Sequence, residues 1–127
     1  MMRTAAQLTA EDLAPYRETA QRRSAEREAR VAQRRSRAEA LSSSAATLLR
    51  DQYGANKVVL FGSLIRPDRF NETSDIDLAA EGIHPRLFFQ AVGALNDLTA
   101  EFEFDLIDID DCRSELLATI QAEGKVL

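Results

Sequence analysis

Two aspartates, Asp75 and Asp77, stand two residues apart in a segment, 74–79, in which polar and apolar residues alternate. Such alternation predicts a β-strand with one face on a core, so both carboxylates leave the same face with their Cα atoms roughly 6.6 Å apart. Carboxylates this close raise each other's pKa and need positive charge beside them. Magnesium suits such a pair, because it completes its octahedron with water and phosphate oxygens. A solvent-facing strand edge is the alternative interpretation.

A glycine–serine pair, Gly62 and Ser63, follows the apolar run 58–61, which predicts a short buried strand. Glycine lets the backbone approach a phosphate, and the serine hydroxyl can donate a hydrogen bond to the phosphate or cap a following helix. The pair is not a P-loop, because no Gly-Lys-Ser/Thr sequence completes one. Its presence favours the metal and phosphate interpretation of the two aspartates.

A third carboxylate, Asp105, lies in a second alternating segment, 102–109, and shares a face with Ile107. A charged side chain within an apolar strand needs a partner, and a metal ion is one. Glu103 lies on the same face, whereas Asp108 lies on the opposite face. The pattern alone therefore favours Asp105 over Glu103 by a small margin.

The elements that position these residues alternate between strands and helices. Strands are predicted at 58–61, 74–79 and 102–109. Apolar spacing predicts a helix over 85–98 and a last helix around 116–120 that stops at Gly124. The final pair, 126–127, could add an edge strand. This order predicts an α+β or α/β domain with three main strands.

The first part of the chain has a different composition. Residues 16–50 are dominated by Ala, Arg, Glu and Gln, without Gly or Pro, which predicts a long helix. The serine triplet at 42–44 is its expected weak point. Thr9 and Asp12, three residues apart, are expected to cap a short turn before Pro15.

Charge also differs between the two parts. Residues 1–50 carry 10 Arg against 6 Asp or Glu, a net +4, whereas 51–127 carry 6 Lys or Arg against 15 Asp or Glu, a net −9. An acidic body argues against direct nucleic-acid binding by phosphate neutralisation. We therefore divide the chain into an N-terminal helical arm, 1–44, and a domain, 45–127.

Five arginines of the arm follow 4-3-4-3 spacing and form one helical stripe. They are Arg23, Arg27, Arg30, Arg34 and Arg37. Further along, the same face carries Leu41, Ala45 and Leu48, which should pack on the body. The stripe itself is either a solvated helix face or a docking surface for an acidic partner or RNA.

The overall composition, 45% hydrophobic and 29% charged, is that of a globular protein. No apolar run approaches the ~20 residues of a membrane span, and the N-terminus lacks the apolar core of a signal peptide. A cytoplasmic location is therefore expected. The single cysteine, Cys112, excludes an internal disulfide and lacks the clustered partners of a zinc site.

Three motifs together resemble the DNA polymerase β-type nucleotidyltransferase superfamily. They are LFGS at 60–63, SDIDL at 74–78 and FDLI at 104–107. The small size and the closing segment 120–127 resemble its minimal nucleotidyltransferase (MNT) branch. The interval from Leu64 to Ser74 is slightly longer than usual, and Pro67 replaces the usual glycine. These departures bear on loop geometry and rate more than on metal binding.

The resemblance implies a mixed sheet flanked by helices and nucleotidyl transfer from a nucleoside triphosphate. It implies that Asp75 and Asp77 hold two Mg²⁺ ions about 3.5–4 Å apart. Asp105 would bind the ion that activates the acceptor hydroxyl. The residues implied to bind the triphosphate are Gly62, Ser63 and Arg66.

MNT proteins are typically antitoxins of HEPN-type RNase toxins, and some transfer AMP from ATP to a tyrosine of the toxin. The resemblance therefore implies an antitoxin that adenylylates its cognate HEPN toxin, with the arm contributing to docking. Two alternatives stay open. One is an antitoxin that neutralises by binding alone. The other is a nucleotidyltransferase acting on a small molecule or RNA, which would normally need an acceptor-binding domain.

Overall fold

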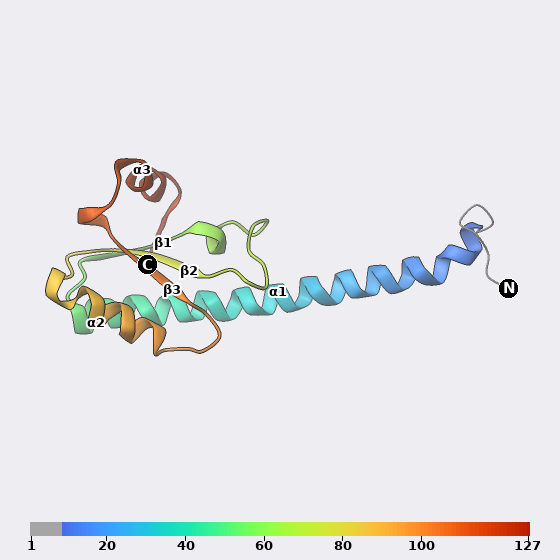
Figure 1. Cartoon of the computed structure of the whole chain (residues 1–127), viewed down its shortest axis with the longest axis horizontal. Coiled ribbons are helices and arrows are strands. Elements are labelled where there is room, and N and C mark those ends of the chain that lie inside the picture. The colour runs from blue at the N-terminus through green and yellow to red at the C-terminus, as the bar shows by residue number, and fades with distance from the viewer. Residues whose placement is uncertain (1–8) are drawn as a thin grey trace.

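A computed structural model describes residues 9–127 of the chain (Figure 1). Its helices are α1 (Ala10–Tyr53), α2 (Pro85–Asn96) and α3 (Ser114–Glu123). Its strands are β1 (Lys57–Phe61), β2 (Ile76–Glu81), β3 (Phe104–Asp108) and β4 (Lys125–Val126). Two 3₁₀ turns, η2 (Gly62–Ile65) and η3 (Ile109–Asp111), follow β1 and β3. Among the described residues, no helix is both long and apolar enough to cross a membrane.

The four strands form one mixed sheet in the order β3-β2-β1-β4. Strand β2 pairs parallel with β3, whereas β1 pairs antiparallel with both β2 and β4. The predicted mixed sheet is confirmed, and so is the edge pairing at the end of the chain, which begins one residue earlier than expected. Leu127 extends it by donating its N–H to the Val58 carbonyl at 2.9 Å.

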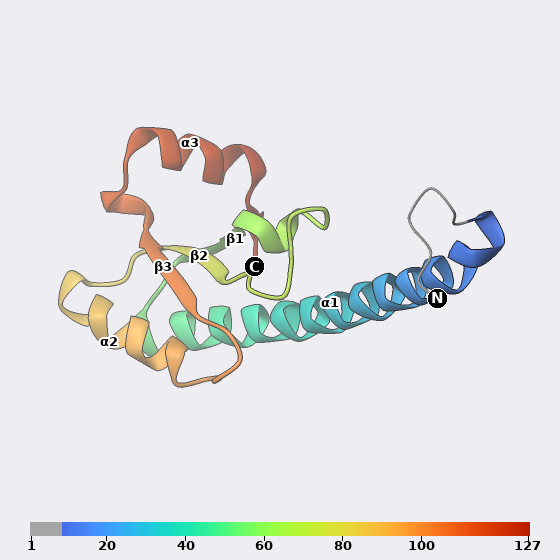
Figure 2. The same ribbon diagram turned by 45° about the vertical axis from the view of Figure 1, so that its right-hand side comes forward.

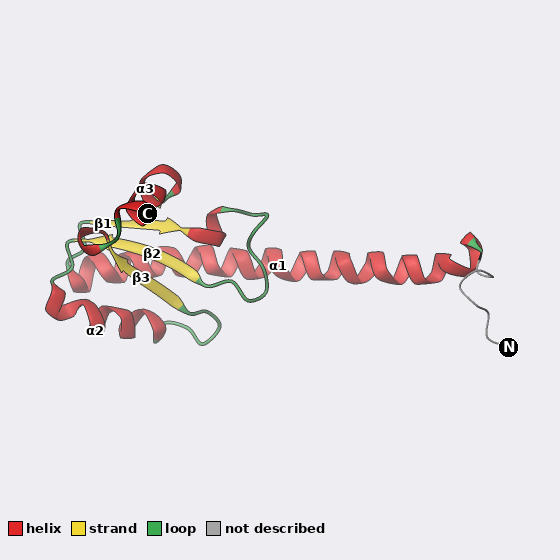
Figure 3. Cartoon of the chain, turned by 45° about the horizontal axis from the view of Figure 1, so that its top comes forward, coloured by secondary structure: helices red, strands yellow, loops and turns green. Residues whose placement is uncertain are grey.

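The sheet is covered on both faces, which explains the continuous apolar run of β1. Helices α1 and α2 lie against one face, and α3 lies on the other (Figures 2 and 3). The α1 face forms the larger core, to which β2 contributes Ile76, Leu78 and Ala80. A smaller cluster, Val59, Phe61, Ala79 and Ile120, forms on the α3 face.

Helix α1 is continuous over 44 residues and runs unbroken through the serine triplet, its expected weak point. Ser42 is fully buried, and its hydroxyl donates to the Ala38 carbonyl at 2.8 Å. Satisfied inside the helix, this small side chain lets α1 lie close to the sheet.

The capping signal at Thr9 and Asp12 belongs to a longer element than the sequence analysis predicts. Thr9 and Asp12 form a capping box, but it begins α1 itself and not a short separate turn. Pro15 lies inside the helix, beyond its first turn. The expected turn before Pro15 is therefore wrong, because the helix continues past the proline.

Helix α1 has a packed inner part and an exposed outer part. Its buried residues are Ala38, Ser42, Ala45, Ala46 and Leu49. Leu41 and Leu48 pack on the core as predicted, and so does Val31, which lies 14 residues before the predicted domain boundary at 45. Residues 15–30 are all exposed, and this part projects well beyond the sheet (Figure 1). Residues 1–8 of the predicted arm lie outside the described residues, and the division at 44 stays a prediction.

Candidate active site

Asp77 and Asp105 lie opposite each other on neighbouring parallel strands. They are direct register partners between β2 and β3, and Phe61 of β1 is the partner of Asp77 on its other side. Both aspartates share a face with residues of the α3 side: Ala79 lies two residues after Asp77, and Ile107 lies two residues after Asp105. The structure therefore brings these two predicted site residues together on the sheet face opposite α1.

The neighbouring acidic residues are placed differently. Asp108 is the register partner of Ala80, a residue of the α1 face, and its carboxylate accepts a hydrogen bond from the Asp110 N–H at 2.9 Å. Glu103 precedes β3, is exposed, and has its carbonyl bonded to the Ile76 N–H at 3.0 Å. The strand register thus places Asp105 next to Asp77. The sequence pattern alone favoured Asp105 over Glu103 by only a small margin.

The three aspartates bring like charges close together, and the pKa of Asp77 responds to this. The pKa of Asp77 is raised to about 6, first by burial and then by the charge of Asp105, a hydrogen bond to Asp105 and the charge of Asp75. Asp75 comes directly before β2 and is half-buried. Carboxylates gathered in this way are stabilised when a cation enters between them.

The donor set fits a hard divalent cation, since it consists of carboxylate oxygens only. Within residues 9–127, no three His, Cys, Asp or Glu side chains are already arranged to hold a metal ion together. Magnesium is commonly held by one or two carboxylates while water and substrate phosphates fill its other positions. Asp75, Asp77 and Asp105 are therefore suited to an ion that is bound together with a nucleotide.

Gly62 lies directly against the Asp77 carboxylate. Its φ is +80°, in the left-handed region, and a Cβ at this position would overlap Asp77 Oδ2. Both the backbone conformation and the space therefore require glycine. Ser63 follows it in η2, half-buried, and its carbonyl accepts the Arg66 N–H at 3.0 Å. The predicted phosphate-binding pair thus borders the carboxylates.

Arg66, the third predicted triphosphate ligand, forms an ion pair with Glu123 at the end of α3. Both side chains are partly exposed, at 32% and 41%. The sequence analysis did not identify Glu123, because it is 57 positions away in the chain and only the fold brings α3 to this edge. A bound triphosphate would compete with Glu123 for the guanidinium group.

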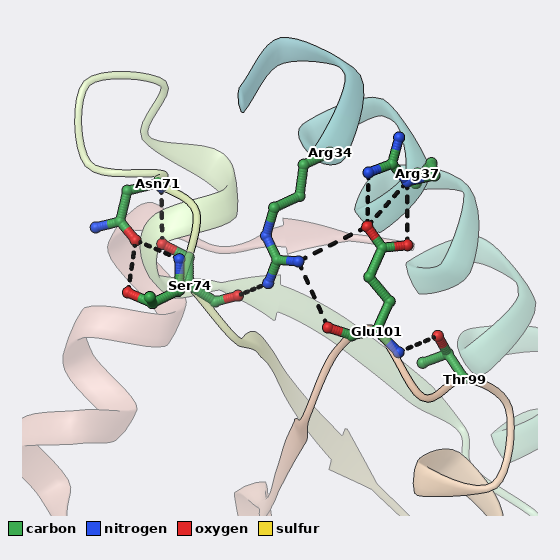
Figure 4. Close-up of polar contacts among 7 residues, drawn as sticks. Arg34, Arg37, Asn71, Ser74, Thr99 and Glu101 are labelled. Carbon is green, nitrogen blue, oxygen red and sulfur yellow. Dashed lines mark hydrogen bonds and ion pairs between the residues drawn. The ribbon is translucent and has the colours of Figure 1, made fainter. Parts of the chain in front are cut away.

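Two arginines of the stripe bind the body, which neither interpretation of the stripe anticipated. Arg37 donates to the Glu101 carboxylate from Nε at 2.9 Å and from Nη2 at 2.6 Å. These bonds lower the pKa of Glu101. Arg34 contacts the same loop (Figure 4). The sequence contains one sign of this docking: the arginine stripe lies on the same helix face as the apolar residues that begin at Leu41.

Three solved structures share this fold. A toxin–antitoxin structure with AMP-PNP aligns with a TM-score of 0.58 at 22% identity, over 67% of this chain and 70% of that chain. The toxin–antitoxin MntA–HepT aligns with a TM-score of 0.54 at 21% identity, over 69% of each chain. A tri-AMPylated Shewanella oneidensis HEPN toxin in complex with an MNT antitoxin aligns with a TM-score of 0.54 at 20% identity, over 70% of each chain.

A comparison with curated protein sequences found no match. The family model described as polymerase beta, nucleotidyltransferase matches residues 44–127, which include the glycine–serine pair and all three aspartates. The predicted superfamily and the predicted fold are both confirmed. The chain belongs to the polymerase β nucleotidyltransferase family, and its fold is that of the MNT antitoxins.

Proposed function

We propose that this protein is an antitoxin that transfers AMP from ATP to a tyrosine hydroxyl of a cognate HEPN toxin. The observation that carries the proposal is the placement of Gly62 against the Asp77 carboxylate in a chain of this family. Asp105 is the register partner of Asp77 on the neighbouring strand. The similar structures indicate the class of acceptor. One contains AMP-PNP, and another contains an AMPylated HEPN toxin.

In this proposal Asp75, Asp77 and Asp105 hold Mg²⁺, which, when bound, neutralises phosphate charge and favours the ionised form of the acceptor hydroxyl. Gly62 leaves room for the triphosphate, and the Ser63 hydroxyl donates to one of its oxygens. Arg66 exchanges Glu123 for the triphosphate. A new bond forms between the tyrosine oxygen and the α-phosphorus, the bond to the β-phosphate oxygen breaks, and pyrophosphate leaves. The protein contributes positioning and charge, as phosphoryl transfer requires.

The arm is proposed to contribute to toxin docking. With Arg34 and Arg37 bound to the body, the outer members of the stripe, Arg23, Arg27 and Arg30, stay exposed. Arg27 also lines a groove of about 540 Å³ between α1 and the turn that contains Pro67. An acidic toxin surface fits the three exposed arginines, because complementary charge speeds encounter and fixes orientation.

The test is direct AMP transfer. The partner to use is a helical protein encoded beside this gene that carries the Arg-x4–6-His signature of HEPN RNases. Incubation with ATP and Mg²⁺ should increase the mass of the toxin by one or more AMP units, and chelation of Mg²⁺ should prevent this. No mass increase, under conditions in which the protein still neutralises the toxin, would contradict the enzymatic proposal.

That outcome would leave the second candidate, an antitoxin that acts by binding alone. Its specific support is the Arg66–Glu123 ion pair, which occupies a guanidinium that the enzymatic proposal assigns to the triphosphate. Glu123→Gln distinguishes the two candidates. It should increase ATP affinity if Arg66 is a phosphate ligand, and it should leave ATP affinity unchanged if the protein acts by binding alone.

A further inference from the structure

Arg34 of α1 reaches the two segments that lead into β2 and β3. Its side chain is only 15% exposed. Nη2 donates to the Ser74 carbonyl at 3.0 Å, and Nη1 donates to the Glu101 carbonyl at 3.4 Å (Figure 4). Its guanidinium carbon lies 4.1 Å from the centre of the Phe102 ring. One side chain therefore joins α1, the approach to β2 and the approach to β3.

These approaches decide where the carboxylates stand. Ser74 directly precedes Asp75, and its hydroxyl accepts the Asn71 N–H at 2.9 Å, which closes the turn before β2. Two residues after Ser74, the Ile76 N–H donates to the Glu103 carbonyl at 3.0 Å and begins the pairing of β2 with β3. That pairing sets Asp77 opposite Asp105. The contacts of Arg34 thus lie at the start of the ladder that holds both aspartates.

Arginine is well suited to this place, and lysine is not. The planar guanidinium presents several donors in a rigid fork and stacks on an aromatic ring, so it can bond two carbonyls and cover Phe102 together. A lysine ammonium is a point charge and would keep one of these contacts at most.

We propose that Arg34 is a positioning residue for the site. From the α1 side of the sheet it holds the 71–74 turn and the Glu101 loop together, and this fixes Asp75, Asp77 and Asp105 on the opposite side. The inference rests on the proposed function for its effect on nucleotide binding. Its effect on the turn is a property of the free chain.

Arg37 provides a matched control. It lies one turn further along α1 and binds the same loop, but only through the Glu101 carboxylate, and its side chain is 53% exposed. Within the described part of the chain, its hydrogen bonds go to Glu101 and not to Ser74. Arg37→Ala therefore removes an arginine from the same interface without releasing the turn.

The experiment compares the full chain with Arg34→Ala, Arg34→Lys and Arg37→Ala. Hydrogen exchange of the peptide 71–77 is measured on the free proteins, and binding of Mg²⁺ with AMP-PNP is measured by calorimetry. Thermal unfolding identifies any variant that does not fold. Arg34→Ala should speed exchange of this peptide and weaken AMP-PNP binding about tenfold or more, since the loss of a residue that orients metal ligands typically costs about 10–100-fold in metal affinity or activity. Arg34→Lys should recover part of both losses, and Arg37→Ala should change neither by more than about threefold.

Transfer kinetics add a second readout. A displaced carboxylate should lower kcat per folded molecule for AMP transfer and leave KM for the toxin unchanged, whereas general destabilisation would lower only the folded fraction and leave both constants per folded molecule unchanged. Unchanged exchange in Arg34→Ala would overturn the proposal. Faster exchange with unchanged AMP-PNP binding would also overturn it, since Arg34 would then serve the turn alone. A wild-type chain that binds no Mg²⁺ and AMP-PNP would instead contradict the proposed function, and the exchange data would still decide whether Arg34 holds the turn.

Discussion

The two faces of β2 serve different purposes within six residues. Toward α1, Ile76, Leu78 and Ala80 are at most 2% exposed and belong to the larger core. Toward α3, Asp77 is half-buried, and this burial together with two neighbouring carboxylates raises its pKa. One face stabilises the fold by burying apolar surface, and the other holds like charges together at a cost in stability. The strand alternation makes both possible, because neighbouring side chains never share a face.

The largest expected effect is on the charged face. Asp105→Asn should lower AMP transfer by at least about a hundredfold, a loss typical of removing one electrostatic contact to a transition state. Glu103→Gln and Asp108→Asn should have much smaller effects, because neither carboxylate stands in register with Asp77. Mass spectrometry of the toxin over time measures all three. Equal losses would show that the site does not follow the β2–β3 register.

A substitution on the apolar face should instead lower the free energy of unfolding. Leu78 is fully buried, so Leu78→Ala should lower the free energy of unfolding by about 2–5 kcal/mol. Denaturant unfolding measures this. Val126→Ala is the control, since Val126 is 61% exposed and should change stability by less than about 0.5 kcal/mol. If Leu78→Ala were as mild as the control, the division of labour between the two faces would be wrong.

The pH dependence of stability should reveal the cost of the charged face. The pKa of Asp77 is about 6 in the folded chain against an ordinary 3.8, so the folded state binds the proton more tightly. The contribution of Asp77 to the free energy of unfolding should therefore be greatest below about pH 4 and decrease as the pH rises to about 6. Asp77→Asn should remove this decrease. Titration of stability from pH 4 to pH 7, with Asp110→Asn as an exposed carboxylate control, measures the difference.

The smallest expected effect lies outside the sheet, on the arm. Arg27→Glu with Arg30→Glu should weaken toxin binding, more at low salt than at moderate salt, because exposed charges are screened. Single exposed pairs contribute only about 0–1 kcal/mol, so the double change is the fair test. The matched control is Arg17→Glu with Arg22→Glu, which alters the charge equally on other sides of the same helix. Identical affinities for both doubles would show that the stripe is a solvated face.

The predictions from the sequence succeeded where local pattern and burial agree. The apolar run of β1, the alternation of β2 and the spacing of α2 all identified real elements, within two residues at most ends. The structure departs from two expectations about α1. The serine triplet was taken as a weak point because serine competes for backbone hydrogen bonds, but Ser42 is buried against the body and its hydroxyl is satisfied within the helix. Thr9 was assigned to a short turn before Pro15, whereas its capping box begins α1 and the proline lies inside this helix.

The sequence by itself determines much of the chemistry of the site. Residue type determines which metal and phosphate ligands exist, and the strand alternation determines which of them share a face. They identified Asp75 and Asp77 as a pair, and Gly62 as a place where the backbone can approach closely. The tertiary structure decided which distant residues meet. The parallel register places Asp105 opposite Asp77, the end of α3 brings Glu123 to Arg66, and the packing of α1 brings Arg34 to Ser74. No local pattern contains such contacts, because they depend on how whole elements pack to bury their apolar faces.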